Sequence, residues 1–165
     1  MATAVTTVDI HDIARSARTF DLGGFYVITP LKSQTQLVER LLRHWVEGTG
    51  AVYNPTRRNA LSLVKVEESI EATVGDISRD WGAEVKVVAT AARSHRENIG
   101  YHEFRDVLSE RSQPFLLLFG TGWGLTEEVI GNSDYILDPI EGTDYNHLSV
   151  RSAVAIILDR LLGRR

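Results

Sequence analysis

Apolar and polar positions follow two periods along the chain, one typical of helices and one of strands. Apolar residues at helical spacing predict amphipathic helices at residues 10–20, 33–48, 69–81, 101–109 and 149–162. Short apolar runs between them predict strands at 25–29, 61–66, 85–90, 115–119 and 135–137. Residues 49–60 match neither period and are expected to form a loop. This alternation predicts a three-layer α/β domain with a mainly parallel sheet.

Length and composition favour a single folded domain over residues 1–165, because no linker or repeat interrupts the pattern. The chain has no cysteine, which excludes disulfides, thiolate nucleophiles and cysteine-ligated metal centres; we expect no metal. Neither a signal peptide nor a membrane span is visible in the pattern. A cytoplasmic protein with no membrane partner is the simplest expectation.

Charge is unevenly distributed. The formal net charge is −4, which argues against a surface that attracts nucleic acid all over. Between Arg111 and Arg151 there is no lysine or arginine, so this stretch favours a cationic ligand or is simply a solvated acidic surface. Its acidic residues are Glu127, Glu128, Asp134, Asp138, Glu141 and Asp144.

A glycine-rich segment follows the apolar run 115–119. Gly120, Gly122 and Gly124 alternate directly after this expected strand. Bare backbone at the carboxyl edge of a parallel sheet allows amides to approach a ligand closely. The segment is not a Walker A loop, and Leu125 stands where a dinucleotide fingerprint has its third glycine. A tight turn without a ligand, or the loop of another α/β nucleotide-binding enzyme, remains an alternative.

Three segments in order resemble the motifs of the SPOUT superfamily of RNA methyltransferases. They are DIHDIARSARTFDL, FGTGWGLTEEVIGNSDYILDPI and NHLSVRSAVAIILDRL. The sequence is most similar to a small single-domain subgroup that resembles the catalytic domain of tRNA guanine-N1 methyltransferase. The resemblance implies a C-terminal deep trefoil knot, S-adenosylmethionine as cofactor, S-adenosylhomocysteine as product, and a tRNA or rRNA substrate. It also implies a homodimer with the last helix in its interface.

The resemblance also assigns site residues. Arg15 aligns with the arginine of the first motif, which helps to activate or orient the acceptor, and is the catalytic candidate. If the residues alone are considered, the alternative to a catalytic role is that Arg15 forms a solvent-exposed ion pair with Asp12. The cofactor-binding candidates are Thr90, Phe119, Gly120, Thr121, Gly122, Gly124, Ile140, Tyr145, Asn146, His147, Leu148 and Ser149. Arg57, Arg93, Arg96 and Glu141 are expected to contact RNA, although loop arginines are commonly just surface residues.

The sequence departs from the motifs in places that bear on the acceptor. Asp9 and His11 stand where ribose methyltransferases have Asn and Gly, and His147 replaces an Asn of the third motif. Ribose oxygen and base nitrogen therefore both remain possible acceptors. The alternative function is a catalytically inactive cofactor-binding module that serves interaction or regulation.

Two tryptophans have different expected surroundings. Trp81 is expected in the core, and Trp123 is expected to cover the cofactor.

Overall fold

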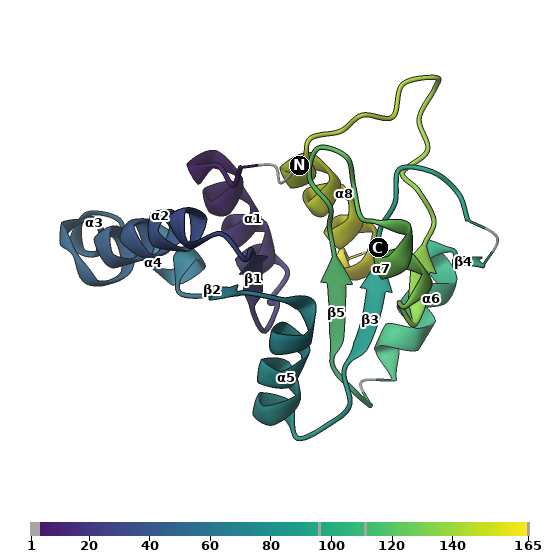
Figure 1. Ribbon diagram of the computed structural model, residues 1–165, viewed down its shortest axis with the longest axis horizontal. Coiled ribbons are helices and arrows are strands. Elements are labelled where there is room, and N and C mark those ends of the chain that lie inside the picture. Colours follow the sequence, from purple (N-terminus) through teal and green to yellow (C-terminus); the bar gives the residue numbers. More distant parts are fainter. Residues whose placement is uncertain (1–3, 96, 111, 165) are drawn as a thin grey trace. The chain divides into compact units, whose positions relative to one another are not determined.

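A computed structural model describes residues 4–95, 97–110 and 112–164 (Figure 1). By internal contacts the chain divides into two compact units, Met1–Thr73 and Val74–Arg165. Both units are α/β, and every strand pair described in them is parallel. No helix in the described ranges is long and apolar enough to cross a membrane.

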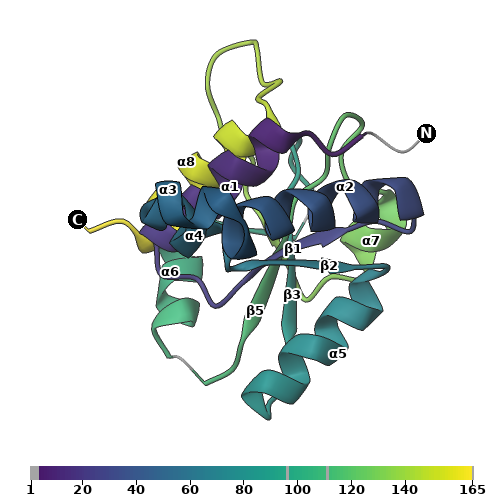
Figure 2. The same ribbon diagram turned by 90° about the vertical axis from the view of Figure 1, so that its left-hand side faces the viewer.

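The first unit pairs two short strands and surrounds them with helices. Figure 2 shows β1 and β2 side by side, with Phe25 opposite Val64 in the register. The elements of this unit are α1 (Thr7–Thr19), β1 (Phe25–Ile28), α2 (Lys32–Leu42), the π-helical turn η1 (Arg43–Glu47), α3 (Thr49–Tyr53), α4 (Pro55–Leu61) and β2 (Val64–Glu67).

The core of the first unit consists of apolar side chains from α1, β1, α2, α4 and β2. Ile10, Val38 and Leu61 are almost completely shielded from solvent and fall on the apolar faces that the helical spacing predicts. The core helices therefore follow from the sequence, with bounds that differ by a few residues.

The expected loop at 49–60 is wrong, because most of this segment is helical as α3 and α4. Pro55 is tolerated because it occupies the first turn of α4, where its missing N–H costs no hydrogen bond. The Asn54 side chain caps that helix by accepting the N–H of Arg57 at 3.0 Å. A helix cap at Ser33 is also not found, since α2 begins after Leu31 with no side-chain cap.

The second unit has a parallel sheet in the order β4-β6-β3-β5. Helix α5 (Ile70–Trp81) runs across the division between the units. Then follow β3 (Lys86–Ala89), β4 (Asn98–Ile99), α6 (Tyr101–Ser109), β5 (Phe115–Leu118), α7 (Glu127–Gly131), β6 (Tyr135–Leu137) and α8 (Val150–Leu162). Strand β4 lies in a polar segment and was not predicted.

The core of the second unit joins the sheet to α6 and α8. Val88 and Leu137 from the sheet pack with Phe104 from α6 and with Ile157 and Leu161 from α8. The expected helix at 149–162 is confirmed, and the Ser149 hydroxyl caps it by accepting the N–H of Ser152 at 3.3 Å. The apolar character of α8 is largely explained by this internal packing.

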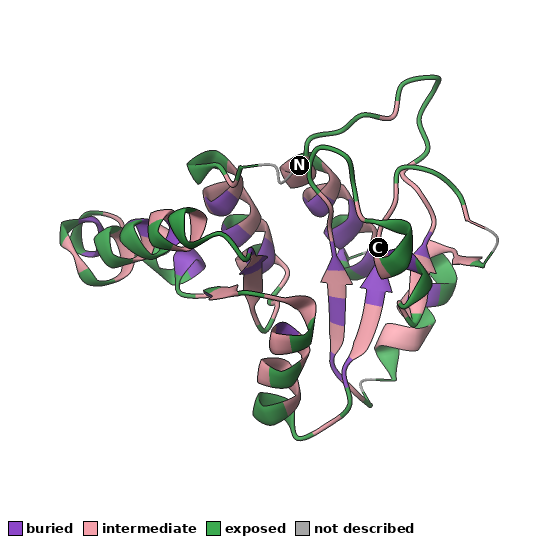
Figure 3. Ribbon diagram, viewed as in Figure 1, coloured by how far each residue is buried: buried purple, intermediate pink, exposed green. Residues whose placement is uncertain are grey.

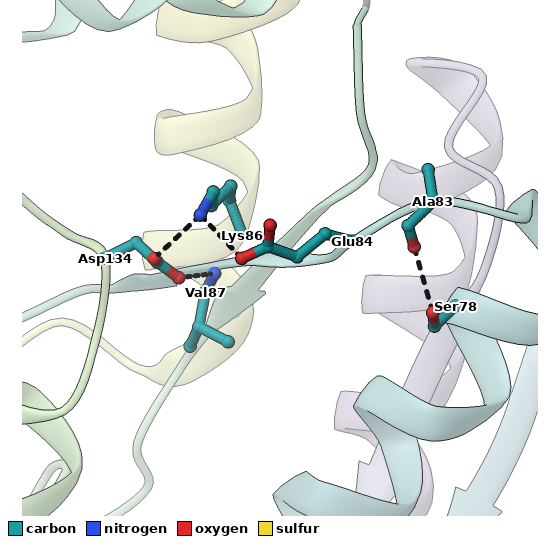
Figure 4. Close-up of polar contacts among 6 residues, drawn as sticks. All are labelled: Ser78, Ala83, Glu84, Lys86, Val87 and Asp134. Atoms are coloured by element: carbon teal, nitrogen blue, oxygen red, sulfur yellow. Dashed lines mark hydrogen bonds and ion pairs between the residues drawn. The ribbon is translucent and has the colours of Figure 1, made fainter.

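Asp134 fixes the start of β6 beside β3 (Figure 4). Its carboxylate accepts the N–H of Val87 at 2.8 Å, and its own N–H donates to the Val87 carbonyl at 2.9 Å. The Lys86 ammonium lies 3.4 Å from the same carboxylate and 2.8 Å from Glu84. The hydrogen bond to Glu84 foremost, and then Asp134, raises the pKa of Lys86. Asp134 therefore has a structural role at the amino end of the strands.

The C-terminal end of α5 shows one further difference from the sequence prediction. The Ser78 hydroxyl donates to the Ala83 carbonyl at 3.0 Å and fastens the turn after α5 (Figure 4). Gly82 has φ +65, which matches its expected role as the helix terminator. Trp81, expected in the core, is instead 63% exposed, because it is the last residue of the helix and lies beyond the packed face.

Candidate functional site

The carboxyl ends of β3, β5 and β6 meet at one edge of the second unit's sheet. The strands are parallel, and Ala89 lies opposite both Leu118 and Ile136 in the register. The residues that follow each strand therefore emerge side by side, at the edge where open α/β sheets bind ligands. This edge brings together Thr90 and the segments that begin at Phe119 and Asp138.

Thr90 extends the pairing of β3 with β5 by one residue. Its hydroxyl donates to the Leu118 carbonyl at 2.8 Å, and its N–H reaches the same oxygen at 3.2 Å. The side chain is half-buried. The hydroxyl is thus held against the strand end, with its oxygen lone pairs still able to accept a hydrogen bond.

The glycine loop after β5 is closed by a tight approach of its two ends. A Cβ on Gly120 would lie 2.6 Å from the Cα of Gly124 and 2.5 Å from the N of Leu125, which only glycine allows. Gly122 and Gly124 have φ +58 and +80, a region that other residues rarely adopt. Space around Gly124 is open. The loop therefore presents exposed backbone, which suits a ligand held by amides and carbonyls.

The loop after β3 contacts both the segment that follows β5 and the segment that follows β6. Arg93 forms an ion pair with Glu127 at the start of α7, directly after the glycine loop. The neighbouring Ala92 carbonyl accepts the Asn146 side-chain amide at 2.8 Å. These two contacts connect one short segment to the start of α7 and to the 145–149 turn. Neither partner is close in sequence, so spacing alone gave no signal of them.

The segment between β6 and α8 is largely exposed, as Figure 3 shows. The Tyr145 and His147 rings lie edge to face with centroids 5.4 Å apart. Ile140 and Phe119, by contrast, are partly buried and pack against the core of this unit. The cofactor-binding candidates thus include both anchored apolar residues and an exposed polar turn.

Acidic side chains around this edge have different surroundings. Glu141 and Asp144 are exposed in the β6–α8 segment, whereas Glu127 is paired with Arg93 and Asp134 is at the opposite end of its strand. Directly after β6, the Asp138 carbonyl accepts a hydrogen bond from the Tyr101 hydroxyl at 2.8 Å. Burial raises the pKa of Tyr101, an effect that the nearby Arg160 guanidinium opposes.

In the first unit, the candidate Arg15 lies exposed on α1. One turn earlier on the same face is His11, half-buried, with its Nδ1 atom shielded and without a hydrogen-bond partner. Burial foremost, and then the positive charge of Arg57, lower the pKa of His11. Asp21, after the end of α1, has φ +55, a left-handed conformation that aspartate tolerates better than most residues.

The expected RNA contacts have mixed surroundings. Arg57 lies over the Trp45 ring, with its Cζ 4.8 Å from the centroid, and is half-buried. Arg93 is exposed but paired with Glu127. Glu141 is exposed, and Arg96 lies outside the described residues. Trp123, expected to cover the cofactor, is 91% exposed. In the described ranges no three His, Asp or Glu side chains are placed to hold a metal ion.

Comparison with known proteins decides the family. A family model described as SAM-dependent RNA methyltransferase matches residues 1–163. The chain belongs to this family. This match confirms the expected family of SAM-dependent RNA methyltransferases. The fold is also similar to that of the SpoU methyltransferase AviRb from Streptomyces viridochromogenes, solved with the cofactor AdoMet. That similarity has a TM-score of 0.59 at 20% identity and covers 96% of this chain and 54% of AviRb.

Two curated relatives are similar to this chain over nearly its whole length. The tRNA (guanine-N(1)-)-methyltransferase of Nitratidesulfovibrio vulgaris is 50% identical over 163 residues, which is 98% of this chain and 38% of that protein. An uncharacterized protein of Aquifex aeolicus is 38% identical over 165 residues, 99% of this chain and 80% of that protein. The chain thus spans well under half of the longer relative.

Proposed function

We propose that this protein transfers a methyl group from S-adenosylmethionine to a nucleotide of tRNA or rRNA. The proposal rests above all on the sheet edge where the glycine loop, the loop after β3 and the 145–149 turn come together. The open backbone and the acidic surroundings there suit a cationic ligand that carries an adenosine. The match to the family over nearly the whole chain supports the same reading.

The cofactor, when bound, supplies a sulfonium-activated methyl carbon. The methyl group moves to the acceptor oxygen or nitrogen as its bond to sulfur breaks, so the protein has to align the acceptor and manage its proton. The backbone of Gly120, Thr121, Gly122 and Gly124 would hold the adenosine, together with Ile140 and the turn Tyr145, Asn146, His147, Leu148 and Ser149. Thr90 and Phe119 would line the same site.

Arg15 is the proposed catalytic residue. Its permanently charged guanidinium would orient the acceptor and stabilise the negative charge that grows as the acceptor loses its proton. Exposure on α1 leaves its side chain accessible to a substrate. Arg93, Arg96 and Glu141 remain proposed RNA contacts, whereas Arg57 is engaged with Trp45.

The finer features of the SPOUT fold are part of the proposal. They are one three-layer domain over residues 1–165, a C-terminal deep trefoil knot, and a cytoplasmic homodimer with α8 in its interface. The family match and the AviRb similarity each extend over both units, which supports a single functional domain. Sedimentation at micromolar concentration tests the dimer, and a monomer would remove it.

The first experiment is calorimetric titration of the purified protein with S-adenosylmethionine and S-adenosylhomocysteine, with NAD as the control. We expect binding of the first two and none of NAD. Incubation of bulk tRNA and rRNA with methyl-labelled cofactor, followed by digestion to nucleosides and mass spectrometry, then identifies the product. Methylation of neither RNA by protein that binds the cofactor would contradict the proposed activity.

The acceptor atom does not follow from the name of the longer relative. That protein extends well beyond the 38% of its length that matches here, so its guanine-N1 activity belongs to the whole protein. The nucleoside product distinguishes the acceptors directly, because a 2′-O-methyl nucleoside and an N-methyl base differ in which fragment carries the added mass.

The second candidate is a cofactor-binding module without catalysis. The replacement of the first-motif Asn and Gly by Asp9 and His11 favours it, because these positions precede the proposed catalytic arginine. Under this alternative the cofactor binds in calorimetry, no RNA is methylated, and Arg15→Ala changes nothing that can be measured. The labelling experiment therefore distinguishes the two functions, because only the methyltransferase produces a methylated RNA.

A further inference from the structure

The segment from η1 to α4 carries an aromatic side chain that no part of its own unit covers. On the short helix α3, Val52 is 86% exposed and Tyr53 is 92% exposed. Figure 3 shows exposed positions along this part of the first unit. A single exposed apolar residue is ordinary, but two adjacent ones with a freely accessible aromatic ring form a potential contact surface.

The segment that carries this aromatic residue has a net positive charge, although the protein as a whole is acidic. This segment, residues 43–61, contains three arginines and one glutamate, which is 3 − 1 = +2, against −4 for the whole chain. Arg43 and Arg58 are exposed. Arginine forms bidentate contacts with phosphate and also stacks on bases. The charge therefore complements a polyanion and disfavours a basic or neutral partner.

The segment is also held in a defined shape. The Arg57 guanidinium lies over Trp45, and Asn54 caps α4 immediately after Tyr53. From α1, the Arg18 guanidinium donates to the Asn59 carbonyl at 2.8 Å. Ala60 and Leu61 are buried in the core of the unit. Tyr53 is thus presented on a braced support, so little conformational entropy would be lost when a ligand binds it.

We propose that Tyr53, with Arg43 and Arg58, forms a docking surface for single-stranded or looped RNA, in which the ring stacks on an unpaired base and the arginines contact phosphates. This inference rests on the proposed function and specifies how its RNA substrate is held. Arg57 has a positioning role, since it braces the segment through Trp45 instead of contacting RNA.

The test is fluorescence anisotropy of the full chain with fluorescein-labelled bulk tRNA. Tyr53→Ala is expected to weaken binding about fivefold to a hundredfold, the range for loss of one base–aromatic stack, and Tyr53→Phe is expected to restore it. The double variant Arg43→Glu, Arg58→Glu should weaken binding and make log Kd less dependent on log salt, by roughly 0.7 per lost phosphate contact.

Matched controls come from α5. Trp81→Ala removes another exposed aromatic residue, and Arg79→Glu reverses another exposed arginine; both should bind tRNA as the wild type does. Thermal melting of every variant checks folding. Wild-type affinity in folded Tyr53→Ala and in the double variant would overturn the inference, as would no tRNA binding by the wild type. So would a variant that loses self-association but keeps tRNA affinity, because the surface would then bind protein.

Cofactor calorimetry on the same samples separates the two proposals. If the wild type binds tRNA through Tyr53 but binds no S-adenosylmethionine, the proposed function fails and the docking surface stands. If it methylates tRNA and Tyr53→Ala leaves both KM and kcat unchanged, the docking surface fails and the proposed function stands. We expect Tyr53→Ala to raise KM for tRNA and to leave cofactor affinity unchanged.

Discussion

Gly120 and Gly124 approach each other at the two ends of the glycine loop so closely that a Cβ on Gly120 would lie 2.6 Å from the Cα of Gly124. The loop returns on itself before it enters α7, whose first residue Glu127 is paired with Arg93. Its shape is therefore set by its own backbone and by one contact to the neighbouring loop.

Gly120→Ala should open this loop. The added methyl group has no space, and such overpacking costs about 1–3 kcal/mol in a packed region. We expect S-adenosylmethionine affinity to fall about tenfold or more, measured by calorimetry, since each 1.4 kcal/mol of lost binding is a factor of ten. Gly131→Ala is the control, because nothing lies within 4 Å of the Cβ position there. Equal affinity in the two folded variants would contradict the role given to Gly120.

Asn146→Ala should loosen the 145–149 turn. The variant loses the hydrogen bond to the Ala92 carbonyl at 2.8 Å, which holds the turn beside the loop after β3. A hydrogen bond of this kind contributes about 0.5–1.5 kcal/mol, so cofactor affinity should fall by roughly threefold to tenfold with little change in melting temperature. Asn132→Ala, at an exposed position after α7, should bind as the wild type does. A lower melting temperature with unchanged affinity would make the contact purely structural.

Arg15→Ala should separate catalysis from cofactor binding. Removal of a group that orients the acceptor and its developing charge typically lowers the rate by about a hundredfold or more. We expect that loss in a methylation assay with labelled cofactor, while calorimetry shows unchanged S-adenosylmethionine affinity. Arg79→Ala, another exposed arginine, is the control. Unaltered methylation by Arg15→Ala would dismiss Arg15 as the catalytic residue.

His11 should make the protein less stable in mild acid. Burial and the charge of Arg57 place its pKa below the usual 6.5 in the folded state, so the unfolded chain binds the proton more readily. The free energy of unfolding therefore falls as the pH is lowered from about 7.5 through 6.5 and on through the folded-state pKa. In His11→Gln, the decrease in melting temperature between pH 7.5 and 5.5 should be smaller than in the wild type.

The control for this pH effect is His102→Gln, because His102 has a side chain that is 96% exposed. Its decrease in melting temperature over the same interval should match that of the wild type. If His11→Gln also matched the wild type, the half-buried imidazole would not be a source of acid sensitivity.

The local sequence pattern was sufficient to predict a helix or strand where the element has one clear apolar face and ordinary capping or terminating residues at its ends. Helix α6 has the expected bounds, and α8 begins after its Ser149 cap. The pattern failed at 49–60, which matches neither period and was therefore expected to form a loop. Gly50 is instead buried in α3, and Pro55 opens α4. Packing against the rest of the unit outweighed weak local preference there.

What the sequence determined by itself is the α/β class, the parallel strands and the glycine loop at a strand end, because these depend on periodicity and on residues adjacent in the chain. Only the tertiary structure decided that Arg93 meets Glu127, that the Asn146 side chain reaches the Ala92 carbonyl, and that the Arg57 guanidinium lies over the Trp45 ring. The tertiary structure also leaves the Tyr53 side chain exposed on α3. These relationships join residues far apart in sequence, and side-chain contacts of that kind are set by how the elements pack, which no local spacing encodes.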